Sequence, residues 1–249
     1  MVALLIGLVF LLAGLFSMLG LGGSLLYVPL FKWFGYDFKS VAIPTALLLN
    51  GVTALTAAVR YLRAGMVDVK GSWPLVVTSL LGAPCGALLT GIVPTRTLML
   101  LFIAGLVVAA LRMLRVSGRE EPETLLPLRR RLILTGLAGF GIGVIAGMLG
   151  LGGGFLIVPL LIALGYPTKR AAATSAFVVV FSSFSGFLGH VAAGHFDRTL
   201  MLGGLAAVIA GSWLGSRIMI DKADPRLIKR MFGVVLLVVA VKLAWGVVR

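Results

Sequence analysis

Eight long apolar runs dominate this chain, and each is close to the roughly 20 residues that a helix needs to cross the hydrocarbon of a bilayer. Because lipid offers no hydrogen-bond partner to a backbone amide, runs of this length fold as helices, and no barrel-like alternation of polar and apolar residues interrupts them. The sequence therefore predicts an all-α polytopic membrane protein with about eight long transmembrane helices. The runs cover approximately residues 3–19, 41–62, 73–91, 96–115, 132–149, 171–191, 199–218 and 227–247.

The composition supports the same conclusion. Of the 249 residues, 60% are hydrophobic and 12% are charged, whereas a soluble domain is about half apolar and a quarter charged. This excludes a soluble enzyme, a disordered chain and a disulfide-stapled secreted domain, and the single cysteine, Cys85, has no second cysteine to pair with. The net charge of +14 does not indicate a nucleic-acid partner, because most basic residues lie between apolar runs, where they anchor helix ends.

The two halves of the chain resemble each other. At an offset of 130 residues, Met18–Tyr36 matches Met148–Tyr166 with 12 identities in 19 positions. Each copy contains a short apolar run, 24–34 or 154–164, that is too short to cross a bilayer alone. Matches continue downstream, so the chain is a duplication. We expect a first membrane repeat at 1–115, a polar linker at 116–131 and a second repeat at 132–249.

The distribution of Lys and Arg predicts how the halves are oriented. If each first helix and its short partner form a hairpin that enters and leaves on one side, 16 basic residues fall on one side and 5 on the other. The positive-inside rule favours this arrangement over one that divides the charges evenly. Each half then has three full crossings, so the two halves are inverted and the linker is cytoplasmic.

Two glycine-rich helix breaks are the strongest candidates for a site. In each, glycine allows a sharp turn, and the short helix that follows points its unpaired N–H groups and partial positive charge at the break. Such an N-terminus binds an anion without a charged side chain, and paired breaks of this kind mark the substrate site of many transporters. The alternative is that the glycines only allow close packing of helices. The candidate residues are Gly20, Gly22, Gly23 and Ser24 in the first break and Gly150, Gly152, Gly153 and Gly154 in the second.

Neutral polar side chains within the apolar runs would complete an anion site. The candidates are Thr45, Asn50, Thr174 and Ser175, and their alternative role is hydrogen bonding between helices. All eight acidic residues lie in or beside the gaps, which argues against a cation substrate. We find no spacing typical of metal ligands and predict no metal and no cofactor.

Other polar and glycine positions have simpler interpretations. Asp68 and Asp197 match across the repeat and are interpreted as N-caps of the helices that follow them. The only histidines, His190 and His195, are interpreted as interfacial residues, with proton uptake as the alternative. The patterns Gly82-x-x-x-Gly86 and Gly211-x-x-x-Gly215 predict helix-packing faces.

The doubled Gly-x-Gly-Gly-x-x-x-x-x-Pro element at Gly20–Pro29 and Gly150–Pro159, with the Gly-x-x-Asp before the third helix of each half, resembles the sulfite exporter TauE/SafE family. The resemblance covers essentially the whole chain. It implies a multi-pass transporter of the prokaryotic plasma membrane that carries sulfite, organosulfonates or related sulfur-containing anions. Ser24 stands where the second copy has Gly154, so the two loops differ at this position.

Our leading hypothesis is therefore a secondary transporter of a small oxyanion, bound where the two breaks meet near the membrane midplane. Its partners would be the anion and the lipid bilayer, while a coupling ion (proton or sodium) and a homo-oligomer are left open. No ATP-binding Walker A pattern is present. The alternative is a non-transporting membrane scaffold or accessory subunit that packs through its glycine faces. A membrane-embedded enzyme is disfavoured, because the sequence contains no recognisable catalytic constellation.

Overall fold

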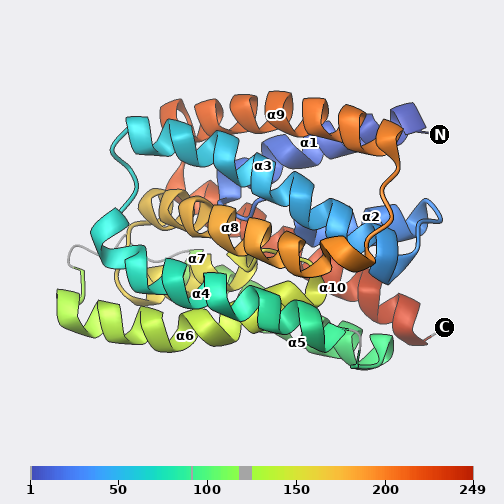
Figure 1. Cartoon of the computed structure of the whole chain (residues 1–249). Coiled ribbons are helices and arrows are strands. Elements are labelled where there is room, and N and C mark those ends of the chain that lie inside the picture. The colour runs from blue at the N-terminus through green and yellow to red at the C-terminus, as the bar shows by residue number, and fades with distance from the viewer. Residues whose placement is uncertain (1, 91, 118–124, 249) are drawn as a thin grey trace.

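The computed structural model describes residues 2–90, 92–117 and 125–248, and within these residues every regular element is a helix. Eight α-helices have 18–24 residues each, and they lie side by side in one bundle (Figure 1). They are α1 (Val2–Leu19), α3 (Ile43–Arg63), α4 (Val69–Thr90), α5 (Thr95–Ser117), α6 (Leu128–Leu149), α8 (Thr168–His190), α9 (Arg198–Asp221) and α10 (Pro225–Val248).

Six of these helices are long and apolar enough to cross a membrane, namely α1, α3 together with the preceding π-helical turn η1 (Phe38–Ala42), α4, α6, α8 and α9. This confirms a polytopic helical membrane protein. The remaining long helices, α5 and α10, have 23 and 24 residues, and their crossing of the membrane remains a prediction.

The two short helices form where the repeats predicted them. Helix α2 (Ser24–Trp33) and helix α7 (Gly154–Ala163) have 10 residues each. The preceding long helices end in glycines with left-handed backbone, Gly20 (φ 70°) and Gly150 (φ 73°). Only glycine adopts this conformation at no steric cost, so the chain can leave the long helix and turn into the short one.

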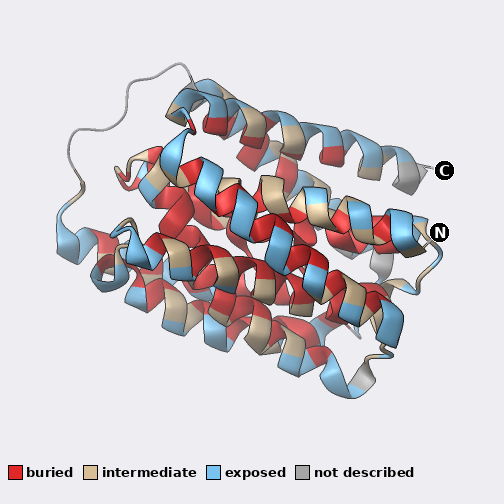
Figure 2. Ribbon diagram, turned by 90° about the horizontal axis from the view of Figure 1, so that it is seen from above, coloured by how far each residue is buried: buried red, intermediate tan, exposed pale blue. Residues whose placement is uncertain are grey.

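Helices α3 and α8 form the centre of the bundle. In their apolar windows 72% and 67% of the residues are buried, against 33% in α1 and 44% in α4, α6 and α9. The outer helices are buried on their inward faces and exposed on their outward faces (Figure 2). Both central helices carry buried polar side chains, among them Asn50 of α3 and Ser183 of α8.

The most extensive contacts between helices each have a counterpart between the equivalent helices of the other half. Helix α1 packs against α9 as α6 packs against α4, and the equivalent helices α3 and α8 pack against each other, as do α5 and α10. Along α3 and α8, a Cβ on Gly186 would contact Leu47, while Asn50 bonds to Ser183, so these two helices run antiparallel. An inverted repeat predicts this orientation for equivalent helices.

Helix α6 begins four residues before the apolar run that predicted it. Pro127 precedes its first residue, Leu128, and Arg129–Arg131 lie within the helix. Arginine has a good helix propensity, and its long side chain can reach polar surroundings from a helix end. Part of the predicted linker, residues 118–124 with Arg119 and three glutamates, lies outside the described residues.

The predicted glycine faces are confirmed as packing surfaces. A Cβ on Gly82 or Gly86 would overlap a backbone carbonyl oxygen of α6, and a Cβ on Gly211 or Gly215 would overlap a backbone carbonyl oxygen of α1. Backbones this close need glycine, because any side chain would push the helices apart.

We expect Gly86→Ala to lower the thermal unfolding midpoint of the purified protein in detergent, because the added methyl group overlaps the Val144 carbonyl. Overpacking of this kind costs about 1–3 kcal/mol. Gly141→Ala is the matched control in α6, since a Cβ there meets nothing within 4 Å and alanine favours helix. Equal midpoints for the two variants would show that the α4–α6 contact tolerates a side chain.

Candidate anion-binding site at the helix breaks

The two glycine-rich breaks meet at the side chain of Asn50, in the middle of α3. Asn50 Oδ1 accepts a hydrogen bond from the backbone N–H of Ser24, the first residue of α2, at 2.8 Å. Asn50 Nδ2 donates to Ser183 Oγ of α8 at 2.7 Å. A Cβ on Gly22 would overlap Oδ1, and a Cβ on Gly152 would overlap Nδ2. One fully buried amide thus lies against both breaks and connects the two halves.

Serines of α8 bind the carbonyl groups that the breaks leave free. Ser175 Oγ donates to the Gly20 carbonyl at 2.8 Å, and Ser182 Oγ donates to the Gly152 carbonyl at 2.6 Å. The breaks also touch directly, because a Cβ on Gly154 would lie 2.8 Å from the backbone of Leu21. Irregular backbone is therefore surrounded by protein, as a membrane interior requires.

Backbone conformation and lack of space both require glycine in these loops. Gly22 (φ 86°) and Gly152 (φ 63°) combine a left-handed backbone with contact to Asn50. Gly23 has an extended backbone (φ 172°) that any residue adopts, and its requirement is space, because a Cβ there would overlap the buried Tyr27 ring. Side chains in these loops would displace the groups that line the site.

Two hydroxyl groups of predicted site residues are buried and have no hydrogen-bond partner among the described residues. They are Ser24 Oγ, at the N-terminus of α2, and Thr45 Oγ1, near the start of α3. Both residues have no exposed surface. The counterpart of Thr45 in the other half is Ser175, which does have a partner. A buried hydroxyl without a partner is costly unless something else binds it.

Most of the predicted site residues lie at the two helix breaks, but the side chain of Thr174 does not. Thr174 Oγ1 accepts a hydrogen bond from the backbone N–H of Asp68 at 3.1 Å, away from the breaks. Gly153 lies within the second break as the N-cap of α7, but a Cβ there would face Ile142 and Ala146. The predicted residues at or beside the breaks are Gly20, Gly22, Gly23, Ser24, Asn50, Gly150, Gly152, Gly153, Gly154 and Ser175.

Ser182 and Ser183 were not among the predicted site residues, although both bond to the site. A signal was present in the run of three serines within an apolar helix, at 182, 183 and 185. Periodicity did not distinguish the serines that face the centre of the bundle from Ser185, which is partly exposed and bonds to Leu80 of α4.

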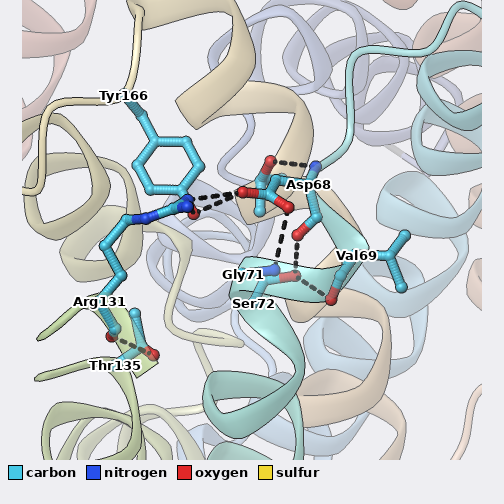
Figure 3. A network of polar contacts seen from close by, with 8 residues as sticks. Asp68, Val69, Gly71, Ser72, Arg131, Thr135 and Tyr166 are labelled. Carbon is cyan, nitrogen blue, oxygen red and sulfur yellow. Dashed lines mark hydrogen bonds and ion pairs between the residues drawn. The ribbon is translucent and has the colours of Figure 1, made fainter. Parts of the chain in front are cut away.

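A second polar cluster joins α4, α6 and the connection between α7 and α8 (Figure 3). Arg131 Nη1 donates to Asp68 Oδ2 at 2.8 Å and to the Tyr166 hydroxyl at 2.7 Å. The Tyr166 hydroxyl in turn donates to Asp68 Oδ2 at 2.9 Å. The side chains of Arg131 and Asp68 are 11% and 13% exposed, so water screens this ion pair much less than a surface pair.

The capping role predicted for Asp68 and Asp197 is confirmed, but Asp68 does more. Asp68 Oδ1 accepts from the Gly71 N–H at 2.9 Å, and Asp197 Oδ1 accepts from the Leu200 N–H at 2.9 Å. Burial raises the pKa of Asp68, yet hydrogen bonds from Gly71, Tyr166 and Arg131 outweigh it and hold the pKa below its usual value. Burial and the neighbouring Asp68 carboxylate raise the pKa of Tyr166 to about 12. At the offset of 130, Arg131 corresponds to Met1, so the arginine is not repeated in the other half.

The interfacial role predicted for the histidines stays a prediction, and the structure encloses His190 within the protein. Its side chain is buried, and its ring Nε2 lies 3.0 Å from the Gly147 carbonyl oxygen. The end of α8 packs against α4, where a Cβ on Gly189 would contact Ala87, so the helix end is enclosed by protein. His195 is exposed, and its backbone N–H donates to the Ser40 carbonyl at 2.8 Å.

We expect Asp68→Asn to lower stability at neutral pH by about 1–3 kcal/mol, because the ion pair is lost. Asp197→Asn is the matched control, since it also replaces a capping carboxylate, and Asp197 forms no ion pair among the described residues.

The folded-state pKa of Asp68 is lowered, so the stabilisation by its carboxylate is present above the unfolded pKa and is lost as pH falls through the folded value. Denaturation midpoints should therefore decrease more steeply between about pH 5 and 3 in the wild type than in Asp68→Asn. Equal pH slopes would contradict this role.

Comparison with known proteins agrees with this architecture. Residues 5–243 match the sulfite exporter TauE/SafE family. The chain is 27% identical over 229 residues to the probable membrane transporter protein YunE of Bacillus subtilis, with 81% of each chain covered. It is 29% identical over 238 residues to a probable membrane transporter protein of Xylella fastidiosa, with 92% of this chain and 89% of the relative covered.

A shorter match reaches a plant protein. Over 83 residues the chain is 37% identical to sulfite exporter TauE/SafE family protein 3 of Arabidopsis thaliana, which covers 32% of this chain and 17% of the relative. No solved structure matches the chain. Because the family match spans nearly all of the helical bundle described above, the protein belongs to the sulfite exporter TauE/SafE family of membrane transporters.

Proposed function

We propose that this protein is a secondary transporter of a small sulfur-containing oxyanion, such as sulfite or an organosulfonate, and that the anion binds where the two helix breaks meet. The observation that carries the proposal is the Asn50 side chain, which bonds to the N-terminus of α2 on one side and to α8 on the other. One buried side chain is therefore hydrogen-bonded to both halves of the molecule.

The groups around Asn50 suit an oxyanion. In the structure, Oδ1 occupies the acceptor position at the N-terminus of α2 that an anion oxygen would take. If the anion displaces Oδ1, it gains the Ser24 N–H, the unpartnered Ser24 hydroxyl and the amide hydrogens of Asn50 as donors. Hydrogen bonds to an ionised group are about twice as strong as neutral ones, and the dipole of α2 adds to them.

The charge distribution supports an anion rather than a cation. Among the described residues no carboxylate is bonded to Asn50, Ser24 or Ser183, and the carboxylates of Asp68 and Asp197 lie at helix ends. A cation would find no charge to offset the loss of its hydration, which is large inside a membrane.

We further propose that the halves are inverted repeats that rock around this site to give alternating access. The antiparallel packing of α3 and α8 supports this proposal, because Asn50 of α3 bonds to Ser183 of α8 and the two helices would move with opposite halves. The Asp68–Arg131 pair joins the two halves at the helix ends beside the linker, and we expect it to hold that end closed in the present conformation.

We expect Asn50→Asp to reduce sulfite flux into proteoliposomes by about a hundredfold or more, because a like charge inside a site costs several kcal/mol. Asparagine and aspartate have the same shape, so this change isolates charge better than Gly22→Asp, whose Cβ would overlap Asn50. Asn50→Ser keeps a hydrogen-bond donor and should retain measurable flux, and unfolding midpoints of both variants check that they fold. Undiminished flux in Asn50→Asp would remove Asn50 from the site. No flux of sulfite, sulfonate or sulfate in the wild type would favour the scaffold alternative.

Substrate protection tests whether both halves line one site. In a Cys85→Ala background, single cysteines replace Ser24 in α2 and Ser183 in α8, which lie on opposite sides of the Asn50 amide. We expect sulfite to slow the reaction of both cysteines with a small thiol reagent, and a cysteine at the exposed His195, between α8 and α9, serves as the unprotected control. Protection of one cysteine but not the other would show that the breaks do not share a site.

A further inference from the structure

We propose that a second anion site, separate from the helix breaks, binds an anionic amphiphile, a molecule with a sulfonate or phosphate head and an apolar chain. The site is a cavity of about 210 Å³ between α2, η1, α5, α6 and α10. Its volume is below the roughly 300–1,000 Å³ of drug-sized pockets, so it fits a small molecule or the end of a larger one. It does not depend on transport, because it would bind such a ligand whether or not the protein moves it.

Two lysines give the cavity its charge. Lys32, in the last turn of α2, and Lys242, in α10, both line it. Neither forms an ion pair with an acidic side chain among the described residues. The closest acid to Lys32 in the sequence is Asp37, and its Oδ1 already accepts hydrogen bonds from the backbone N–H and the hydroxyl of Ser40. Two cations without a counterion make the cavity a place where an anion is favoured.

Lys242 has an exposed side chain and lies six residues before Val248, the last residue of α10. It follows eleven uncharged residues, Met231–Val241, within α10, and an ionisable residue within an apolar helix is a functional candidate by default. Its ammonium group lies 3.7 Å from the centre of the Trp33 ring, while Lys32 Nζ lies 5.5 Å from the centre of the Phe38 ring. These aromatic contacts hold the lysines at the cavity without neutralising them.

The rest of the cavity wall is apolar, which indicates that the ligand has an apolar chain besides its anionic head. Val28 and Leu243 line the cavity together with Leu149, the last residue of α6. An inorganic oxyanion would gain nothing from this surface, whereas an alkyl chain would gain the free energy of burial. Leu149 directly precedes the second helix break at Gly150, so the cavity borders the break region without including Asn50 or Ser24.

Fluorescence quenching by brominated ligands tests the proposal on the full-length protein in phosphatidylcholine nanodiscs. Trp33 lines the cavity, so Trp73, Trp213 and Trp245 are replaced by Phe to leave it as the only emitter. Two probes distinguish the sources of the anionic head: 2-bromoethanesulfonate added in solution, and brominated phosphatidylglycerol compared with brominated phosphatidylcholine at equal mole fraction.

We expect saturable quenching by the sulfonate, by phosphatidylglycerol in excess of phosphatidylcholine, or by both. The apparent dissociation constant should rise about tenfold in Lys242→Gln and in Lys32→Gln, because each removes one cation. Lys242→Arg should retain binding, and Lys39→Gln, which alters a lysine of η1 that does not line the cavity, is the matched control.

Equal quenching by the charged and zwitterionic probes, or quenching that Lys242→Gln and Lys39→Gln leave equally unchanged, would overturn the proposal. Its failure is distinguishable from failure of the proposed transport function, because quenching at Trp33 requires no flux and Asn50→Asp should leave it unaltered. Loss of sulfite flux in Asn50→Asp with Trp33 quenching intact would show that the two sites are separate.

Discussion

The centre of this structure depends on the two hydrogen bonds of the buried Asn50 side-chain amide. The amide accepts the N–H at the start of α2 and donates to Ser183 of α8, so one residue satisfies polar groups from both halves. In a membrane interior an unmatched backbone N–H costs several kcal/mol. An amide suits this position because it is both donor and acceptor and carries no charge that would repel an anion.

Close packing of backbone makes this arrangement accessible. Glycines on α4 and α9 bring α6 and α1 within contact of their backbones, and the two pairs hold the hairpins α1–α2 and α6–α7 on opposite sides of α3 and α8. The inward faces of the central helices are then fully enclosed by protein, and these faces carry Asn50, Ser182 and Ser183. The glycines of the outer helices therefore set the positions of α1 and α6, and these helices lead directly into the two breaks.

The two halves are similar in sequence but not in their polar clusters. Both capping aspartates hold the start of their helices, while within the described part of the chain Asp68 alone of the two pairs with an arginine. The lysine-lined cavity also involves α2 and α10, and its Lys32 aligns with Ile162 of α7 at the offset of 130. The two halves therefore share their helix packing, and single differences in sequence at the helix ends distinguish one side of the molecule from the other.

The sequence alone determined the all-helical membrane class, the position of the two short helices, the glycine faces and the family. These follow from local properties: the length of apolar runs, glycine at turns, and an internal match at a constant offset. Which polar side chains meet was decided only by the tertiary structure, because it depends on how helices distant in sequence are rotated and shifted against each other. Thr174 and Ser175 are adjacent, yet one bonds to Asp68 and the other to Gly20. Asn50 and Ser183 lie 133 positions apart and share a hydrogen bond, and a single sequence contains no local signal for such a pair.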